Sequence, residues 1–318
     1  MTQERPSNPV ASYSVVIPVF NSQDIVADTL RRTAAFFESR GLDYEIIAVN
    51  DGSSDRSWDV LEAAASENPK IVAIDLLRNS GQHNANLCGF RAAKGDWVVT
   101  LDDDLQNPPE EIAHLIDKAG EGYDLVIGRF HEKQHAGYRR LGSRLIRFIN
   151  QRIFGQERDL VLTNFRLIQR DVVDRVCAYR GPFPYIPGLC LRYSGRRANT
   201  LVEHHPRRVG NSNYNWRRIL SLVSTILFNY SSFPLRMVAG LGLVTAAISL
   251  LLGLYFLVEG LLGGARVPGW TTIVVMLAFF NGVMMLMLAM LGEYVVRVIN
   301  QITMADPYFV RKIVRDDG

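Results

Sequence analysis

Residues 97–106, WVVTLDDDLQ, run from an apolar, β-branched segment straight into three consecutive aspartates. The first five of them have the length and composition of a buried strand. Similar runs come earlier in the chain, separated by segments of helical periodicity, and they cover Ser14–Val19, Tyr44–Val49 and Ile71–Leu76. Strands that alternate with helices in this way predict an α/β fold with a mostly parallel sheet and flanking helices.

Acidic side chains follow two of these expected strands, at the end where parallel sheets bind their ligands. Asp51 comes after the second strand, and Asp102, Asp103 and Asp104 come after the fourth. Three adjacent carboxylates repel one another, and a hard divalent cation such as Mg²⁺ or Mn²⁺ removes that repulsion. Such an ion can bridge two phosphates and stabilise a departing diphosphate. A solvated acidic turn is the alternative for the cluster taken alone.

The last third of the chain contains two long uncharged runs, residues 237–258 and 267–292. Each exceeds the roughly 20 apolar residues that cross a bilayer core, so we expect two transmembrane helices rather than buried soluble ones. Basic residues precede and follow this pair, whereas Arg266 is the one basic residue in the connector, 259–269. The positive-inside rule then predicts that the soluble part and both termini are cytosolic.

Two further segments, 139–158 and 214–233, combine an apolar stripe with arginines. This pattern is typical of amphipathic helices at an anionic membrane surface. A helix packed on the core of the soluble part is the alternative for the first of them.

Composition excludes several other classes of protein. The formal net charge of the 318 residues is +3, which is too small to indicate nucleic acid as a partner. Cys88, Cys177 and Cys190 show no C-x-x-C spacing, so a reducing compartment is expected.

Residues 131–135, HEKQH, match the H-E-x-x-H zinc motif. That motif requires a helix, and no apolar periodicity surrounds it here, so we interpret it as a chance match in a loop.

Seven short motifs, taken in order, resemble the polyprenyl-phosphate glycosyltransferases of glycosyltransferase family 2. They are VVIPVFN (15–21), VNDGSSD (49–55), RNSGQHNA (78–85), LDDDLQNPPE (101–110), NFRL (164–167), RRVGNSNY (207–214) and LGEYVVR (291–297). The resemblance extends over nearly everything from Ser14 to Val310. It implies a GT-A fold and inverting transfer of a single sugar from a nucleotide-sugar, with UDP favoured, to a polyprenyl phosphate such as undecaprenyl or decaprenyl phosphate.

The resemblance also implies roles for particular residues. The nucleotide-sugar would be contacted by Pro18, Asp51, Gly81, Asp102 and Arg207. The metal, Mg²⁺ or Mn²⁺, would be held by Asp102, Asp104 and Gln106. Asp104 and Arg129 would act in catalysis, and Arg139 and Ser143 would bind the acceptor phosphate. The lipid phosphate is itself the nucleophile in such a reaction, so no strong protein base is needed.

The expected organisation has five parts, in a multi-pass protein of the bacterial inner membrane that is able to form homo-oligomers. They are a flexible tail (1–12), a cytosolic GT-A catalytic domain (13–212), an interfacial helix (213–234), two transmembrane helices (235–293) and a cytosolic C-terminal tail (294–318).

The chain departs from the family pattern at Ser22, Asn164 and Asn213, where glutamate, aspartate and lysine are common. Asn164 and Asn213 suggest a non-catalytic membrane adaptor as one alternative, against which the intact Asp102, Asp104 and Gln106 argue. A processive polysaccharide synthase is another, although no tryptophan of the chain follows an arginine as the Q-x-x-R-W motif of such enzymes requires.

Overall fold

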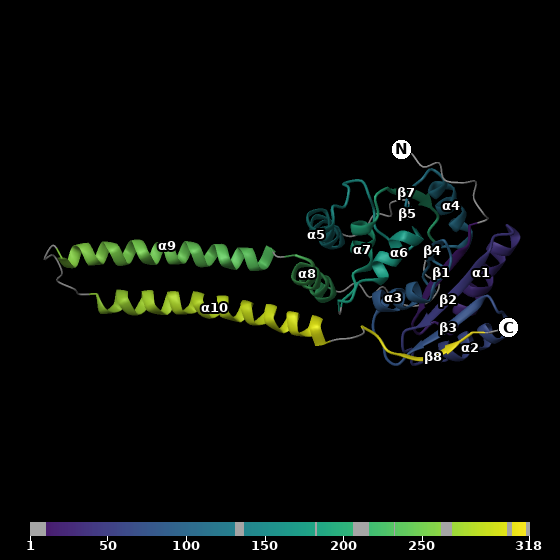
Figure 1. Ribbon diagram of the computed structural model, residues 1–318, viewed down its shortest axis with the longest axis horizontal. Helices are drawn as coiled ribbons and strands as arrows, with labels where there is room; N and C mark the ends of the chain where they lie inside the picture. The colour runs from purple at the N-terminus through teal and green to yellow at the C-terminus, as the bar shows by residue number, and fades with distance from the viewer. Residues whose placement is uncertain are drawn as a thin grey trace. The chain divides into compact units, whose positions relative to one another are not determined.

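We describe the protein from a computed structural model, shown in Figure 1, which covers residues 11–130, 137–181, 183–205, 216–231, 233–261, 269–303 and 307–315. The chain divides into two compact units. The first is formed by the described residues up to Ile219 together with those after residue 303, and the second by residues 220–303.

The first unit contains, within the described residues, an eight-stranded sheet in the order β7-β5-β6-β4-β1-β2-β3-β8. Its strands are β1 (Tyr13–Val19), β2 (Tyr44–Asn50), β3 (Ile71–Leu76), β4 (Trp97–Thr100), β5 (Leu125–Phe130), β6 (Arg166–Gln169), β7 (Arg197–Val202) and β8 (Val310–Val314). The central strands β4, β1, β2 and β3 are parallel, as are β5 and β7. β6 and β8 run antiparallel to their neighbours. The prediction of a mostly parallel sheet is confirmed.

The central strands read as continuous apolar runs because helices cover both faces of a parallel sheet. Every residue of β1 and β3 is buried. The helices of this unit are α1 (Val26–Ser39), α2 (Ser57–Glu67), α3 (Gln82–Ala92), the 3-10 turn η1 (Pro109–Glu111), α4 (Ile112–Gly120), α5 (Gly137–Phe154), α6 (Arg170–Cys177) and α7 (Ile186–Tyr193). Helices α1, α2 and α4 with η1 form one group, and α3, α5, α6 and α7 form the other (Figure 1).

Two contacts show how closely the helices pack on the sheet. The ring of Phe37, on α1, lies between Tyr13 and Tyr44, with centroid separations of 5.6 and 5.2 Å. On the other face, a Cβ added to Gly89 of α3 would lie 2.3 Å from the Val16 side chain. These tight layers hold the carboxyl ends of β1, β2 and β4 in fixed positions relative to one another.

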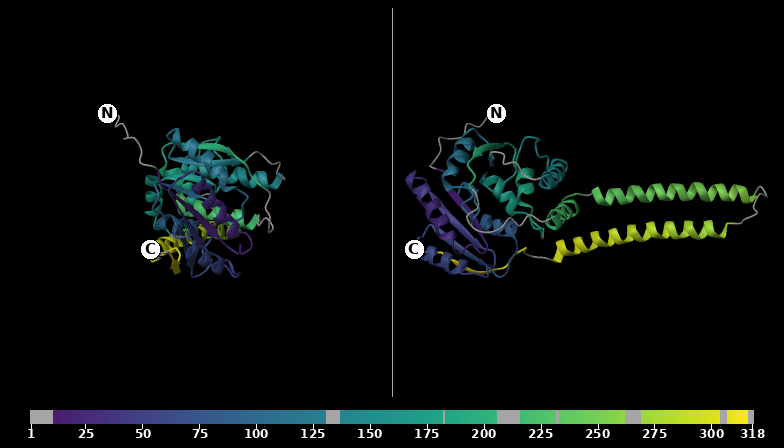
Figure 2. Two further views of the ribbon diagram at one scale, coloured as in Figure 1. Left: turned by 90° about the vertical axis from the view of Figure 1, so that its right-hand side faces the viewer. Right: turned by 180° about the vertical axis from the view of Figure 1, so that it is seen from behind.

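The second unit contains a helical hairpin. Helices α9 (Phe233–Leu261) and α10 (Trp270–Thr303) lie side by side, as the right-hand view of Figure 2 shows. Helix α8 (Trp216–Tyr230) precedes them. Among the described residues, α10 alone is long and apolar enough to span a membrane, through Phe279–Val296. Helix α9 contributes the shorter apolar stretch Phe233–Thr245, so the second predicted span is not confirmed.

One expectation about the C-terminal end is wrong. Residues 294–318 are not a tail, because α10 extends to Thr303 and β8 then pairs with β3 at the edge of the sheet. The pairing buries the Tyr308 side chain, whose hydroxyl accepts a hydrogen bond from Nη1 of Arg91 at 3.1 Å. The chain therefore returns to the first unit after its apolar helices.

Candidate functional site

The acidic residues predicted from the sequence converge on one cavity at the carboxyl ends of β1, β2 and β4. It has a volume of about 610 Å³. The described residues that line it are Pro18, Val19, Phe20, Asp51, Asn79, Gly81, Gln82, Asp102, Asp103, Asp104 and Gln106. The location agrees with the rule that open α/β sheets bind ligands beyond the carboxyl ends of their strands.

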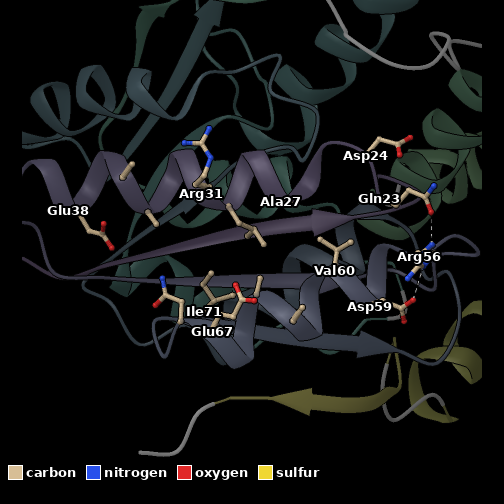
Figure 3. A pocket seen from close by; sticks show the side chains of 16 residues that line it. Gln23, Asp24, Ala27, Arg31, Glu38, Arg56, Asp59, Val60, Glu67 and Ile71 are labelled. Carbon is tan, nitrogen blue, oxygen red and sulfur yellow. Dashed lines mark hydrogen bonds and ion pairs between the residues drawn. The ribbon is translucent and has the colours of Figure 1, made fainter.

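A larger groove, of about 920 Å³, lies between α1 and α2 and is shown in Figure 3. Its floor consists of small apolar side chains, among them Ala27 and Val60. At one end the backbone N–H of Arg56 donates to Oε1 of Gln23 at 2.9 Å. None of the described side chains that were predicted to act in binding or catalysis lines this groove, whereas several line the smaller cavity, which is therefore the candidate site.

Asp51 organises one side of the cavity. Its carboxylate accepts hydrogen bonds from the backbone N–H of Ser80, at 2.6 Å, and of Gly81, at 2.9 Å. Gly81 has a φ of +88°, a conformation that favours glycine. Burial raises the pKa of Asp51, and the two backbone donors act in the opposite direction. Asp51 thus joins the end of β2 to the loop that opens α3, and brings the predicted residues Pro18, Asp51 and Gly81 together.

The three consecutive aspartates have different surroundings. The carboxylate of Asp103 accepts hydrogen bonds from the Ser22 hydroxyl and from the backbone N–H of Phe20. Its backbone carbonyl accepts another from the Thr29 hydroxyl at 3.0 Å. Asp103 therefore ties the loop after β1 to the loop after β4. Leu105, with a φ of 55°, turns the chain just beyond the triplet.

The charges of Asp102 and Asp104 interact inside the cavity, and Asp103 adds a weaker interaction with Asp102. The pKa of Asp102 is raised to about 6, first by burial and then by the charge of Asp104. Oδ1 of Asp104 accepts a hydrogen bond from the backbone N–H of Gln106 at 3.1 Å. A cation between these carboxylates would relieve their repulsion.

The donor chemistry of this pair fits a hard divalent cation. The described residues include no group of three or more His, Cys, Asp or Glu side chains that could hold a metal ion. The candidate donors at the cavity are the oxygens of Asp102, Asp104 and Gln106, all of which line it. Mg²⁺ and Mn²⁺ prefer oxygen ligands, and Mg²⁺ is commonly bound by one or two carboxylates together with substrate phosphates and water.

The remaining predicted residues are not among the described side chains that line this cavity. Arg129 is on β5, where it pairs with Leu201 of β7, and it does not line the cavity. Arg139 and Ser143 are on α5. Arg207 and the HEKQH segment lie outside the described residues.

The structure also adds residues that sequence reasoning missed. Gln82 lines the cavity and donates from Nε2 to Oδ1 of Asp102 at 2.7 Å. Asn164 donates to the same oxygen at 2.6 Å. The half-buried ring of His83 packs edge-on against Tyr185, and desolvation there, followed by the charge of Arg166, lowers the pKa of His83 to about 4. The motifs RNSGQHNA and NFRL contain these side chains, but their spacing did not indicate which of them face the aspartates.

Comparison with known proteins gives a consistent result along the chain. Residues 14–177 match the family described as glycosyl transferase family 2. The undecaprenyl-phosphate 4-deoxy-4-formamido-L-arabinose transferase of Pseudomonas fluorescens (strain SBW25) is 37% identical over 315 residues, which cover 97% of this chain and 91% of that protein. The transferase of the same description from Klebsiella pneumoniae subsp. pneumoniae is 36% identical over 313 residues, covering 96% and 95%.

Solved structures support the fold. A crystal structure of glucosyl-3-phosphoglycerate synthase from Mycobacterium tuberculosis, in complex with Mn²⁺, UDP and glucosyl-3-phosphoglycerate, matches with a TM-score of 0.50 at 17% identity. The match covers 71% of this chain and 84% of that one. At this identity the similarity concerns the fold alone, and it confirms the predicted GT-A type of α/β architecture.

Proposed function

Because the chain belongs to glycosyltransferase family 2, we propose that it transfers a single sugar from a nucleotide-sugar to a polyprenyl phosphate. The observation that carries this proposal is the convergence of Asp51, Asp102 and Asp104 on one cavity at the carboxyl ends of the sheet. Similarity over nearly the whole chain to two undecaprenyl-phosphate 4-deoxy-4-formamido-L-arabinose transferases supports the choice of acceptor.

The nucleotide-sugar, with UDP as the favoured nucleotide, would occupy this cavity. Its volume of about 610 Å³ lies within the range typical of small-molecule sites. Pro18, Asp51 and Gly81 would contact the base and ribose on the side of β1 and β2. Asp51 accepts two backbone hydrogen bonds, so it also fixes the loop at the start of α3 that would close over the nucleotide.

Asp102, Asp104 and Gln106 would hold Mg²⁺ or Mn²⁺ beside the diphosphate. When bound, the ion would neutralise charge on the diphosphate leaving group. Asp103 keeps the loops after β1 and β4 together, so it would preserve the spacing of the two carboxylates without binding the ion itself. Arg207 would add positive charge near the diphosphate.

The acceptor phosphate would attack the anomeric carbon of the sugar. A bond forms from a lipid phosphate oxygen to that carbon, the bond from the carbon to the diphosphate oxygen breaks, and the configuration inverts. The lipid phosphate is anionic at neutral pH, so catalysis would consist mainly of positioning and charge stabilisation. Arg129, Arg139 and Ser143 would orient the acceptor, since arginine suits phosphate geometry.

The acceptor is a membrane lipid, and the apolar helices would keep the enzyme at its surface. We place α8, which lies within residues 213–234, at the interface, and the parts of α9 and α10 that lie within 235–293 across the bacterial inner membrane. Phe279–Val296 supports this assignment for α10. The catalytic domain, 13–212, would face the cytosol together with both termini, and the hairpins of separate copies would provide a surface for self-association.

A lipid-extraction assay tests the proposal. Purified protein would be incubated with undecaprenyl phosphate, Mn²⁺ or Mg²⁺ and labelled nucleotide-sugars, beginning with UDP-linked 4-deoxy-4-formamido-L-arabinose. We expect label in the organic phase only when the lipid phosphate and the divalent ion are both present. A long polymer would instead indicate a processive synthase, and label that stays in water with every donor would indicate a non-catalytic protein.

A further inference from the structure

Within the part of the chain that the structure describes, the Asp102 carboxylate is held on one oxygen. Oδ1 accepts hydrogen bonds from Nδ2 of Asn164, at 2.6 Å, and from Nε2 of Gln82, at 2.7 Å. Among the described residues, no donor lies within hydrogen-bonding distance of Oδ2. The two amides approach from different parts of the chain, one from the segment before β6 and the other from the first turn of α3.

The orientation of the Asn164 amide is determined by its other contacts. Its Oδ1 accepts hydrogen bonds from Nη2 of Arg166, at 2.7 Å, and from Nδ2 of Asn86, at 3.1 Å. Both partners are donors, so the amide oxygen must face them and the NH₂ group must face Asp102. An aspartate at position 164 would face Arg166 equally well, but it would present a second carboxylate to Asp102.

Arg166 anchors this arrangement in the core. Its side chain is among the largest that are fully buried, and Nε donates to the hydroxyl of Thr100 at 3.1 Å. The Thr100 hydroxyl in turn donates to the backbone carbonyl of Asn164. Asn164 is therefore fixed through both its backbone and its side chain, and a rigid donor behind a carboxylate is the arrangement that orients metal ligands in proteins.

We propose that Asn164 and Gln82 are positioning residues that hold Asp102 through Oδ1 and leave Oδ2 to bind the divalent cation. The proposal rests on the function proposed above, because it concerns the same site. It explains why asparagine is suited to position 164: the amide donates to Asp102 and accepts from Arg166 at once, which neither a carboxylate nor an apolar side chain does.

Direct Mn²⁺ binding tests this inference without requiring turnover. The electron paramagnetic resonance signal of free Mn²⁺ would be titrated with the full-length protein in the presence of UDP. Wild type and the variants Asn164→Leu, Gln82→Ala and Asn86→Ala would be compared. Loss of a group that orients a metal ligand typically weakens binding by roughly 10- to 100-fold. We expect a loss of this size for Asn164→Leu and a smaller but measurable loss for Gln82→Ala.

Asn86→Ala is the matched control, because Asn86 is buried but is not bonded to Asp102, and Arg166, whose bond to Asn164 is the shorter at 2.7 Å, still orients the amide when Asn86 is lost. It should lower the melting temperature while changing the Mn²⁺ dissociation constant by no more than about two-fold, well below the loss expected for an orienting group. Equal Mn²⁺ affinity in wild type and Asn164→Leu would overturn the inference. If Asn164→Leu does not fold, Gln82→Ala tests the inference in its place, because Gln82 is exposed. An unchanged Mn²⁺ affinity of Gln82→Ala would then overturn the inference. A wild-type protein that binds no Mn²⁺ with UDP would instead refute the proposed metal site itself.

Discussion

Nη1 of Arg311, on the last strand of the chain, lies 3.3 Å from Oδ2 of Asp75, a buried residue of β3. The other oxygen of that carboxylate accepts a hydrogen bond from Nδ2 of Asn50 at 2.7 Å. Asn50 directly precedes Asp51, which fixes the loop at the start of α3. The strand that follows the apolar helices thus supports the part of the sheet on which the candidate nucleotide site is built.

Replacing Arg311 with alanine should destabilise the first unit, because it removes the positive partner of a buried carboxylate. We expect the free energy of unfolding to fall by about 1 kcal/mol. This is the lower end of the cost of leaving a buried polar group without a partner, because more than half of the Arg311 side chain is exposed. Thermal unfolding in detergent, followed by circular dichroism, measures it. Lys312→Ala is the control, since its partner Glu62 is solvent-accessible. Equal melting temperatures for the two variants would contradict the role given to Arg311.

Replacing Asp51 with asparagine should weaken nucleotide binding. The amide group would oppose one of the two backbone N–H donors, of Ser80 and Gly81, and the loop that they belong to would lose its anchor. We expect UDP affinity to fall by roughly 10-fold, which corresponds to about 1.4 kcal/mol and to one hydrogen bond with a charged group. Isothermal titration calorimetry with UDP provides the measurement. Wild-type affinity in this variant would rule out an organising role for Asp51.

Acid should destabilise the protein through His83. Its pKa is lowered from 6.5 to about 4 by burial, so the unfolded chain binds a proton in this range that the folded chain does not. Stability contributed by neutral His83 is therefore complete above pH 6.5 and declines as the pH falls toward 4. Between pH 7 and pH 5 the decline should amount to at most about 2 kcal/mol.

Comparing the pH dependence of stability in wild type and in His83→Gln isolates the contribution of His83, because both proteins carry the same aspartates. Melting temperatures measured from pH 7 to pH 5 should fall more steeply for wild type. If melting temperature depends on pH equally in the two proteins, the pKa of His83 is the same in the folded and the unfolded chain, which would contradict the prediction.

The sequence predicts the central strands and the position of the site because both depend on local signals. β1 to β4 are continuous apolar runs, and Asp51 and Asp102 follow strands whose carboxyl ends meet at one edge of the sheet. Burial on both faces requires such runs in a parallel sheet.

Other elements lack local signals. β8 contains Arg311 and Lys312, and charges of this kind are common on edge strands, so its composition does not distinguish it from a tail. β6 begins at Arg166, a charged residue that is buried only because Thr100 and Asn164 satisfy it. In both cases the segment forms a strand because it pairs with a part of the chain that is distant in sequence.

The resemblance already separates Asp102 and Asp104 from Asp103, but the bonding partners of the aspartates were equally inaccessible from sequence. Asp103 bonds to Ser22 and Phe20, more than eighty positions earlier, whereas Asp102 bonds to Gln82 and Asn164. Three consecutive aspartates cannot be distinguished from one another by residue type alone. Their partners come from three loops that meet only in the folded chain.

Mass spectrometry of the lipid product tests the central claim most directly. Wild type, Asp104→Asn and Asp103→Asn would each be incubated with undecaprenyl phosphate, Mn²⁺ and a panel of UDP- and GDP-sugars. We predict one sugar per lipid phosphate with wild type, and a loss of product of at least about 100-fold in Asp104→Asn, since electrostatic stabilisation of the leaving group is lost. Asp103→Asn should retain more activity, because the Asp103 carboxylate bonds to the loop after β1. Product that persists in folded Asp104→Asn protein, or that forms in the presence of a chelator, would contradict the account.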